Sequence, residues 1–142
     1  MVQFNKEKQM DAKRKKLRAV FYCTDSGNEP VREWLKALTK TDKKMIGEDI
    51  KTVQFGWPLG MPLGMPLGMP LGMPLGMPLV RSLGDGLWEI RIKLSERRIA
   101  RIIFFMDDNS MVLVTGFIKK SQKTSKTELD LAIKRKRQYE RN

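Results

Sequence analysis

The first half of the chain contains one short apolar run, followed by hydrophobic and polar positions that alternate with a helical period. Residues 17–23 are that apolar run, and they predict a first strand. Apolar side chains then recur at helical spacing over residues 30–38, and a proline at the first helical position costs no hydrogen bond. A second helix is predicted from Asp42 to Gly56, and we expect the two helices to form an antiparallel hairpin.

The second half of the chain has the alternation of strands. Residues 87–94 place apolar side chains on one face and charged side chains on the other. Residues 98–106 are apolar on both sides, which is typical of a central strand, and residues 111–118 follow after a turn. These three runs predict an antiparallel meander.

The end of the chain predicts one more helix. Ser125 and Glu128 have the spacing of a capping box, and Leu129, Ala132 and Ile133 would face inward. The expected order is therefore strand, two helices, three strands, helix. This order indicates an α+β fold, in which an antiparallel sheet packs with an N-terminal helical hairpin and a C-terminal helix.

A proline-rich array separates the two halves. Residues 61–76 are four copies of Met-Pro-Leu-Gly, flanked by one near-copy on each side. The stretch is uncharged, but a proline every four residues forbids a continuous helix, so we exclude a membrane span. We interpret the array as an insertion of variable length in one domain (17–142), behind a basic N-terminal arm (1–16), because loop-closure entropy grows slowly with length.

Composition narrows the possible partners and chemistry. The 142 residues hold 28 Lys plus Arg and 16 Asp plus Glu, a net charge of +12, which favours a polyanionic partner such as nucleic acid. The absence of histidine removes the usual general base and the commonest zinc ligand. The single cysteine, Cys23, excludes a disulfide framework, and we expect it to be a small core residue. The start of the chain lacks an apolar signal segment, so we expect a cytoplasmic protein with no membrane partner.

The charged side chains of the predicted meander are the candidate site. If the strands pair in ordinary register, these side chains come within reach of one another. Arg101 is the most informative of them, because an arginine inside an apolar strand is costly unless it serves a surface or a partner. The full set is Glu89, Arg91, Lys93, Arg98, Arg101, Lys119 and Lys120.

Such a cluster is suited to cleaving RNA without a metal or other cofactor. The ribose 2′-oxygen attacks the adjacent phosphate, a base takes its proton, and cations stabilise the anionic intermediate. Glu89 or a lysine of lowered pKa is the candidate base, and a lysine is the candidate acid. The alternative is an ordinary solvated strand face of mixed charge.

Three stretches in order resemble the RelE/HigB superfamily of bacterial toxins, and the nearest branch is that of the phage-derived HigB-type toxins. They are residues 83–91 (LGDGLWEIR), 101–105 (RIIFF) and 115–124 (TGFIKKSQKT). The resemblance covers residues 17–137 apart from the array. It implies a compact RelE-like fold and an mRNA endonuclease activity, often on the ribosome. It also implies inhibition by a cognate antitoxin, commonly one with a helix-turn-helix domain.

The resemblance also assigns roles to single residues. It implies catalytic positions at Glu89, Arg91, Arg101 and Lys119. We expect further basic residues to bind RNA, namely Lys93, Arg98, Lys120 and Lys123. Some family members rely on a histidine or a late tyrosine; this chain has no histidine, and we do not transfer a role to Tyr139.

Two other functions stay open from the sequence. The first is a catalytically attenuated homologue that binds RNA or the antitoxin, in which the array modulates toxicity. The second is a ligand for a proline-recognising groove, in which the array itself binds a partner.

Overall fold

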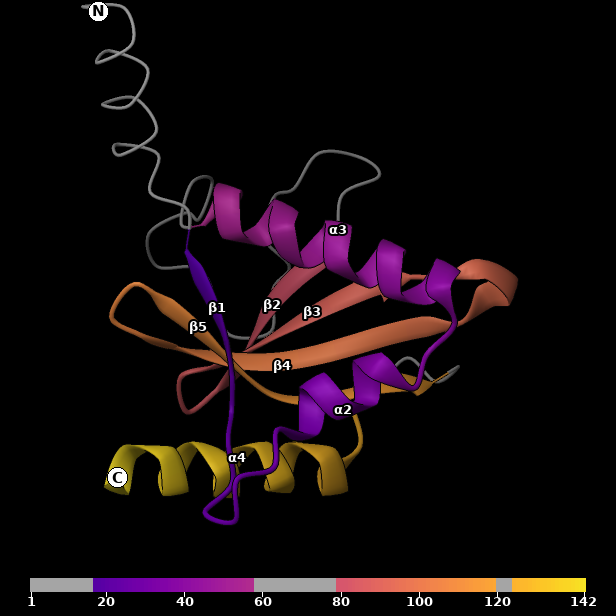
Figure 1. The fold of residues 1–142 in the computed structure, drawn as a ribbon. Coiled ribbons are helices and arrows are strands. Elements are labelled where there is room, and N and C mark those ends of the chain that lie inside the picture. The colour runs from indigo at the N-terminus through magenta and orange to yellow at the C-terminus, as the bar shows by residue number, and fades with distance from the viewer. Residues whose placement is uncertain (1–16, 58–78, 120–123) are drawn as a thin grey trace, which may run out of the picture.

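The computed structural model describes residues 17–57, 79–119 and 124–142, with the backbone alone for Leu79 and Lys119. A five-stranded sheet in the order β1-β5-β4-β3-β2 lies between α2 and α3 on one side and α4 on the other (Figure 1). The predicted N-terminal arm (1–16) and the array (61–76) lie outside the described residues. The elements are β1 (Arg18–Phe21), α2 (Pro30–Lys36), α3 (Lys40–Gly56), β2 (Leu79–Gly84), β3 (Leu87–Lys93), a 3-10 turn (Ser95–Arg97), β4 (Ile99–Asp107), β5 (Ser110–Lys119) and α4 (Lys126–Arg141).

The sheet confirms the predicted meander and corrects the prediction in two respects. Strands β3, β4 and β5 pair antiparallel in chain order. The sheet as a whole is mixed rather than antiparallel, because β1 pairs parallel with β5. The sequence reading also missed β2, an edge strand that pairs antiparallel with β3. Its residues directly follow the repeats and were assigned to the connection.

Strand alternation divides the apolar side chains into two core layers. One layer, which includes Ile90, Ile102 and Phe104, packs with side chains of α2 and α3. The other layer includes Leu87, Ile103 and Phe105, and Ala132 of α4 is buried in it. Both faces of β4 are therefore covered, which explains why its sequence is apolar on both sides.

The cap of α4 was predicted, whereas α3 begins at Lys40, two residues before the predicted start, and is capped by Thr39. Thr39 accepts a hydrogen bond from the Asp42 backbone N–H at the start of α3, and Ser125 accepts one from the Glu128 N–H at the start of α4. The expected helical hairpin is not confirmed, because α2 packs mainly on β5 while α3 packs on β3 and β1. Cys23 was expected in the core, and this was wrong: it lies beyond the end of β1 and is exposed.

Gly116 of β5 is required where α2 crosses the sheet. A Cβ at this position would lie 2.5 Å from Cε3 of Trp34, a distance that side-chain packing does not permit. We expect Gly116→Ala to lower the free energy of unfolding by about 1–3 kcal/mol through overpacking. Gly47→Ala is the matched control, because a Cβ there meets nothing within 4 Å and should stabilise α3 by about 0.5–1 kcal/mol. Urea unfolding of both variants measures the two changes in the free energy of unfolding, which should have opposite signs. If Gly116→Ala left the free energy of unfolding unchanged, the close contact with Trp34 would be contradicted.

Candidate functional site: an arginine cluster on three strands

Three neighbouring strands bring charged side chains together on the face of the sheet that α4 covers in part. Arg81 of β2 lies opposite Glu89 of β3 in the register. Arg91 of β3 lies opposite Arg101 of β4, two residues further along the same face. The four residues form a group that we call the arginine cluster: Arg81, Glu89, Arg91 and Arg101.

Glu89 is the centre of the arginine cluster. Its Oε1 accepts a hydrogen bond from Arg81 Nε at 3.2 Å and one from Arg101 Nη1 at 3.3 Å. Its Oε2 accepts a hydrogen bond from the Thr124 hydroxyl, just before α4. Thr124 Oγ1 in turn accepts from Arg101 Nη1 at 3.2 Å, so that Glu89, Arg101 and Thr124 form a closed triangle.

Burial contradicts the alternative of an ordinary solvated strand face at Glu89 and Arg101. The side chains of Glu89 and Arg101 are both 0% exposed, whereas Arg81 is 26% exposed. A buried arginine is tolerated because its ion pair with Glu89 offsets part of the desolvation. Both oxygens of Glu89 already accept hydrogen bonds from other side chains of the protein. This arrangement disfavours Glu89 as a general base.

Arg91 experiences the positive charge of the arginine cluster. Burial lowers its pKa most, and repulsion from Arg101 and Arg81 lowers it further, while Glu89 acts in the opposite direction. Like charges directly opposite each other on neighbouring strands destabilise the pair. Two guanidinium groups pair with the Glu89 carboxylate and that of Arg91 lies near them, so an anion bound beside Arg91 would be stabilised by the excess positive charge.

The other predicted residues are placed as follows. Lys93 is exposed at the end of β3, on the same side of that strand as Glu89 and Arg91. In the register, Ile99 lies between Lys93 and Lys119, which puts these two lysines in one row across the sheet. Lys120 and Lys123 lie outside the described residues.

Arg98 does not join the arginine cluster. Its guanidinium makes two hydrogen bonds to the Asp42 carboxylate of α3, at 2.8 and 3.0 Å. It therefore fixes the start of α3 to the sheet, away from Arg101. The expected convergence of Arg98 with Arg101 was wrong, because an interval of three residues along a strand places two side chains on opposite faces.

The Asp42–Arg98 pair predicts a pH dependence of stability. The hydrogen bonds from Arg98 lower the pKa of Asp42, and burial opposes them. A carboxyl whose pKa is lower in the folded state contributes stability above its unfolded pKa, near 4, and loses it as the pH falls through the folded value. We expect Asp42→Asn to flatten the loss of stability below about pH 4, as measured by thermal melts across pH. Asp130→Asn, which removes a carboxyl from an exposed site on α4, is the matched control.

Sequence reasoning missed two residues of the site. Arg81 was hidden because it directly follows the near-copy (77–80) that flanks the array, although the alternation of Val80 and Arg81 is a strand signal. Thr124 is the last residue of a stretch already recognised, but nothing in that pattern shows that its hydroxyl reaches β3. Only the start of α4 against the sheet brings it there.

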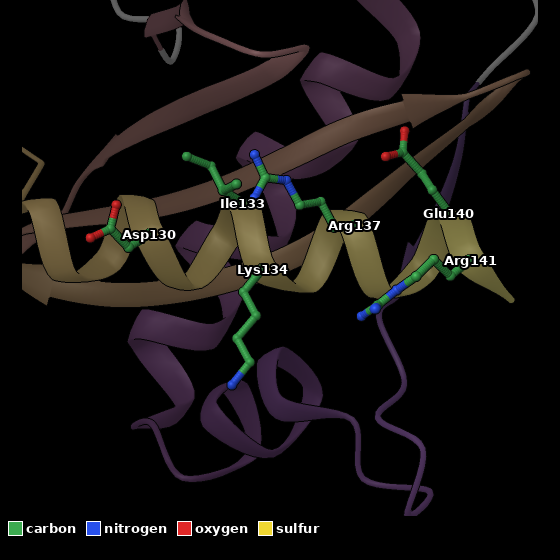
Figure 2. A pocket seen from close by; sticks show the side chains of 6 residues that line it. All are labelled: Asp130, Ile133, Lys134, Arg137, Glu140 and Arg141. Carbon is green, nitrogen blue, oxygen red and sulfur yellow. The ribbon is translucent and has the colours of Figure 1, made fainter.

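A second feature is a hollow of about 720 Å³ along α4 (Figure 2). Three cations and two carboxylates surround one apolar side chain. None of these residues belongs to the arginine cluster. The residues that line it are Asp130, Ile133, Lys134, Arg137, Glu140 and Arg141.

The part of the chain that the structure describes holds neither a metal-binding group nor a membrane-spanning helix. Its residues contain no group of three or more acidic, cysteine or histidine side chains arranged to hold a metal. Within the same ranges, every helix is too short or too polar to cross a bilayer.

The fold and the cluster define a small, basic α+β domain with arginines gathered on one face of its sheet. Residues 69–137, just under half of the chain, match the family of phage-derived Gp49-like proteins (DUF891). This family is RelE-like, and the match is compatible with the toxin of a toxin–antitoxin system. Comparison with curated proteins gave no match, and comparison with solved structures gave none either.

Proposed function

We propose that the protein is the toxin of a toxin–antitoxin system and that it acts as an mRNA endoribonuclease of the RelE type, nearest to the HigB branch. The arginine cluster is the main support for this proposal, because it gathers three arginines around a single carboxylate that pairs with two of them, on a chain of net charge +12. The match of residues 69–137 to the Gp49-like family supports it.

The cluster supplies the electrostatic part of RNA cleavage. Attack of a ribose 2′-oxygen on the adjacent phosphate gathers negative charge on the non-bridging oxygens. Arginine forks bind such oxygens with paired hydrogen bonds, and Arg81 and Arg91 are the accessible members of the cluster. Since Glu89 is occupied, the proton transfers fall to other groups, of which Lys93 and the lysines at 119, 120 and 123 are the candidates.

The proposed setting is the bacterial cytoplasm, with mRNA, and the ribosome that carries it, as substrate. A cognate antitoxin with a helix-turn-helix domain would neutralise the toxin. The hollow on α4 supports a protein partner of this kind, because it combines the cations Lys134, Arg137 and Arg141 with the apolar side chain of Ile133.

One observation favours the attenuated homologue as a second candidate. The array joins α3 to β2, and β2 carries Arg81 only five residues after the array ends at Gly76. Strain or obstruction at that connection would act directly on the arginine cluster. The array would then modulate the activity of the site.

Induced expression without an antitoxin tests both candidates. We expect growth arrest and new 5′ ends in cellular mRNA, mapped shortly after induction. Deletion of residues 61–76 should leave the fold intact, because residues 57–60 and 77–78 still join α3 to β2 and closure entropy changes slowly with the length of a connection. Arrest only after this deletion would support the attenuated homologue. If neither form caused growth arrest or produced new RNA ends, the proposed endoribonuclease activity would be contradicted.

A further inference from the structure

Thr124 connects the start of α4 to the charged centre of the sheet. It precedes Ser125, the residue that caps α4. Its hydroxyl donates to Glu89 Oε2 and accepts from Arg101 Nη1. One small side chain therefore makes a hydrogen bond with each member of a buried ion pair. The two contacts fix the carboxylate of Glu89 in one orientation.

The orientation of Glu89 determines how Arg81 is held. Glu89 Oε1 accepts from Arg81 Nε, the inner nitrogen of the guanidinium group. No side chain or backbone group in the described part of the chain makes a hydrogen bond to the two terminal nitrogens of Arg81. Arg81 is also the partly exposed member of the ion pair, at 26%, above a carboxylate that is fully buried. The terminal nitrogens of a guanidinium group fit two oxygens of a phosphate.

We propose that Arg81 binds a phosphate of the RNA. Glu89, Thr124 and Arg101 form a buried support, which we call the brace, that orients the guanidinium group of Arg81. The brace consists of positioning residues, since none of the three has to touch the substrate. The inference rests on the proposed function for the identity of the ligand, an RNA phosphate. The brace itself rests on the hydrogen bonds alone.

The brace has a physical advantage over an unsupported surface arginine. A free arginine loses considerable side-chain entropy when it is immobilised on a ligand. An arginine already fixed through Nε loses less, so more of the interaction with phosphate appears as affinity. Removing the Thr124 hydroxyl should therefore weaken phosphate binding by Arg81, although Thr124 itself contacts no RNA.

The test uses Thr124→Val, which keeps the shape of the side chain and removes the hydroxyl. Thr124→Ser restores a hydroxyl and should restore function. Thr115→Val is the matched control, because Thr115 is also buried and its hydroxyl has no hydrogen-bond partner among the described residues. The probe is a short RNA made resistant to cleavage by 2′-deoxy substitution, and its affinity is measured at several salt concentrations. The rate at which the Arg81 Nε–H exchanges with solvent hydrogen, followed by NMR, shows without RNA whether the hydrogen bond from Arg81 to Glu89 is intact.

We expect Thr124→Val to reduce RNA affinity about 10-fold and to reduce the salt slope by about one phosphate contact. Arg81→Ala should do the same, and Thr124→Val should have no added effect in the Arg81→Ala background. An equal effect of Thr124→Val in both backgrounds would overturn the inference, and so would unchanged exchange of the Arg81 Nε–H. If the wild type bound no RNA, the proposed function would fall, while faster Arg81 exchange in Thr124→Val would still support the brace.

Discussion

Replacing Arg81 and Arg91 together with alanine is expected to reduce RNA cleavage by at least about 10²–10³-fold, the usual cost of one lost donor at a developing oxyanion. Both side chains are accessible members of the arginine cluster. The fold should tolerate the change, because Glu89 keeps its contacts with Arg101 and Thr124. The measurement is the rate of cleavage by purified protein, with growth arrest as the cellular counterpart.

The matched control removes two positive charges from the opposite side of the molecule. Lys44 and Lys51 are exposed on α3, so Lys44→Ala/Lys51→Ala has the same net charge as the arginine variant. A general effect of charge on RNA affinity would weaken both variants equally. We expect the lysine variant to retain cleavage within a few-fold. Equal activities of the two variants would exclude the arginine cluster as the site.

Glu89→Gln is expected to lower the free energy of unfolding by about 3–5 kcal/mol, the cost of breaking a buried ion pair on one side. The substitution leaves the guanidinium of Arg101 buried without its counter-charge. Urea denaturation measures the loss. Glu140→Gln is the control, because the Lys136–Glu140 pair is partly exposed and its loss should cost less than about 1 kcal/mol.

A second variant separates charge burial from general disruption of the core. Glu89→Leu/Arg101→Met removes both charges, and similar pairs in other proteins are often neutral after such replacement. We expect this double variant to recover much of the stability lost by Glu89→Gln. If Glu89→Gln proved as mild as Glu140→Gln, water would have to reach the pair, and the burial described above would be wrong.

Local patterns of the sequence predicted most of the individual elements. The alternation in residues 87–94 and the apolar run of residues 98–106 predicted β3 and β4, and Ser125 predicted the start of α4. These signals are local, because strand and helix periods and capping bonds involve residues close in sequence. Strand β2 was missed because the repeats before it dominate the local composition.

The candidate site was predicted only in part. The pairing of Arg91 with Arg101 follows from an antiparallel meander of ordinary register, and the structure has that pairing. The separation of Arg98 from Arg101 also follows from strand alternation, and it was overlooked. Arg81 was missed together with β2. Thr124 was missed for another reason, because its contact with Glu89 joins segments that are 35 residues apart in the chain.

The sequence by itself determined that this chain forms a basic α+β domain with an antiparallel meander at its centre, because period, capping and charge are properties of short segments. Only the tertiary structure decided that β1 pairs parallel with β5 and that Glu89 and Arg101 are buried. Burial depends on what covers a side chain, and Thr124 at the start of α4 comes from 35 residues beyond Glu89 in the chain. Because these contacts bury Glu89, it is no longer a candidate base, and its carboxylate instead holds the guanidinium group of Arg81.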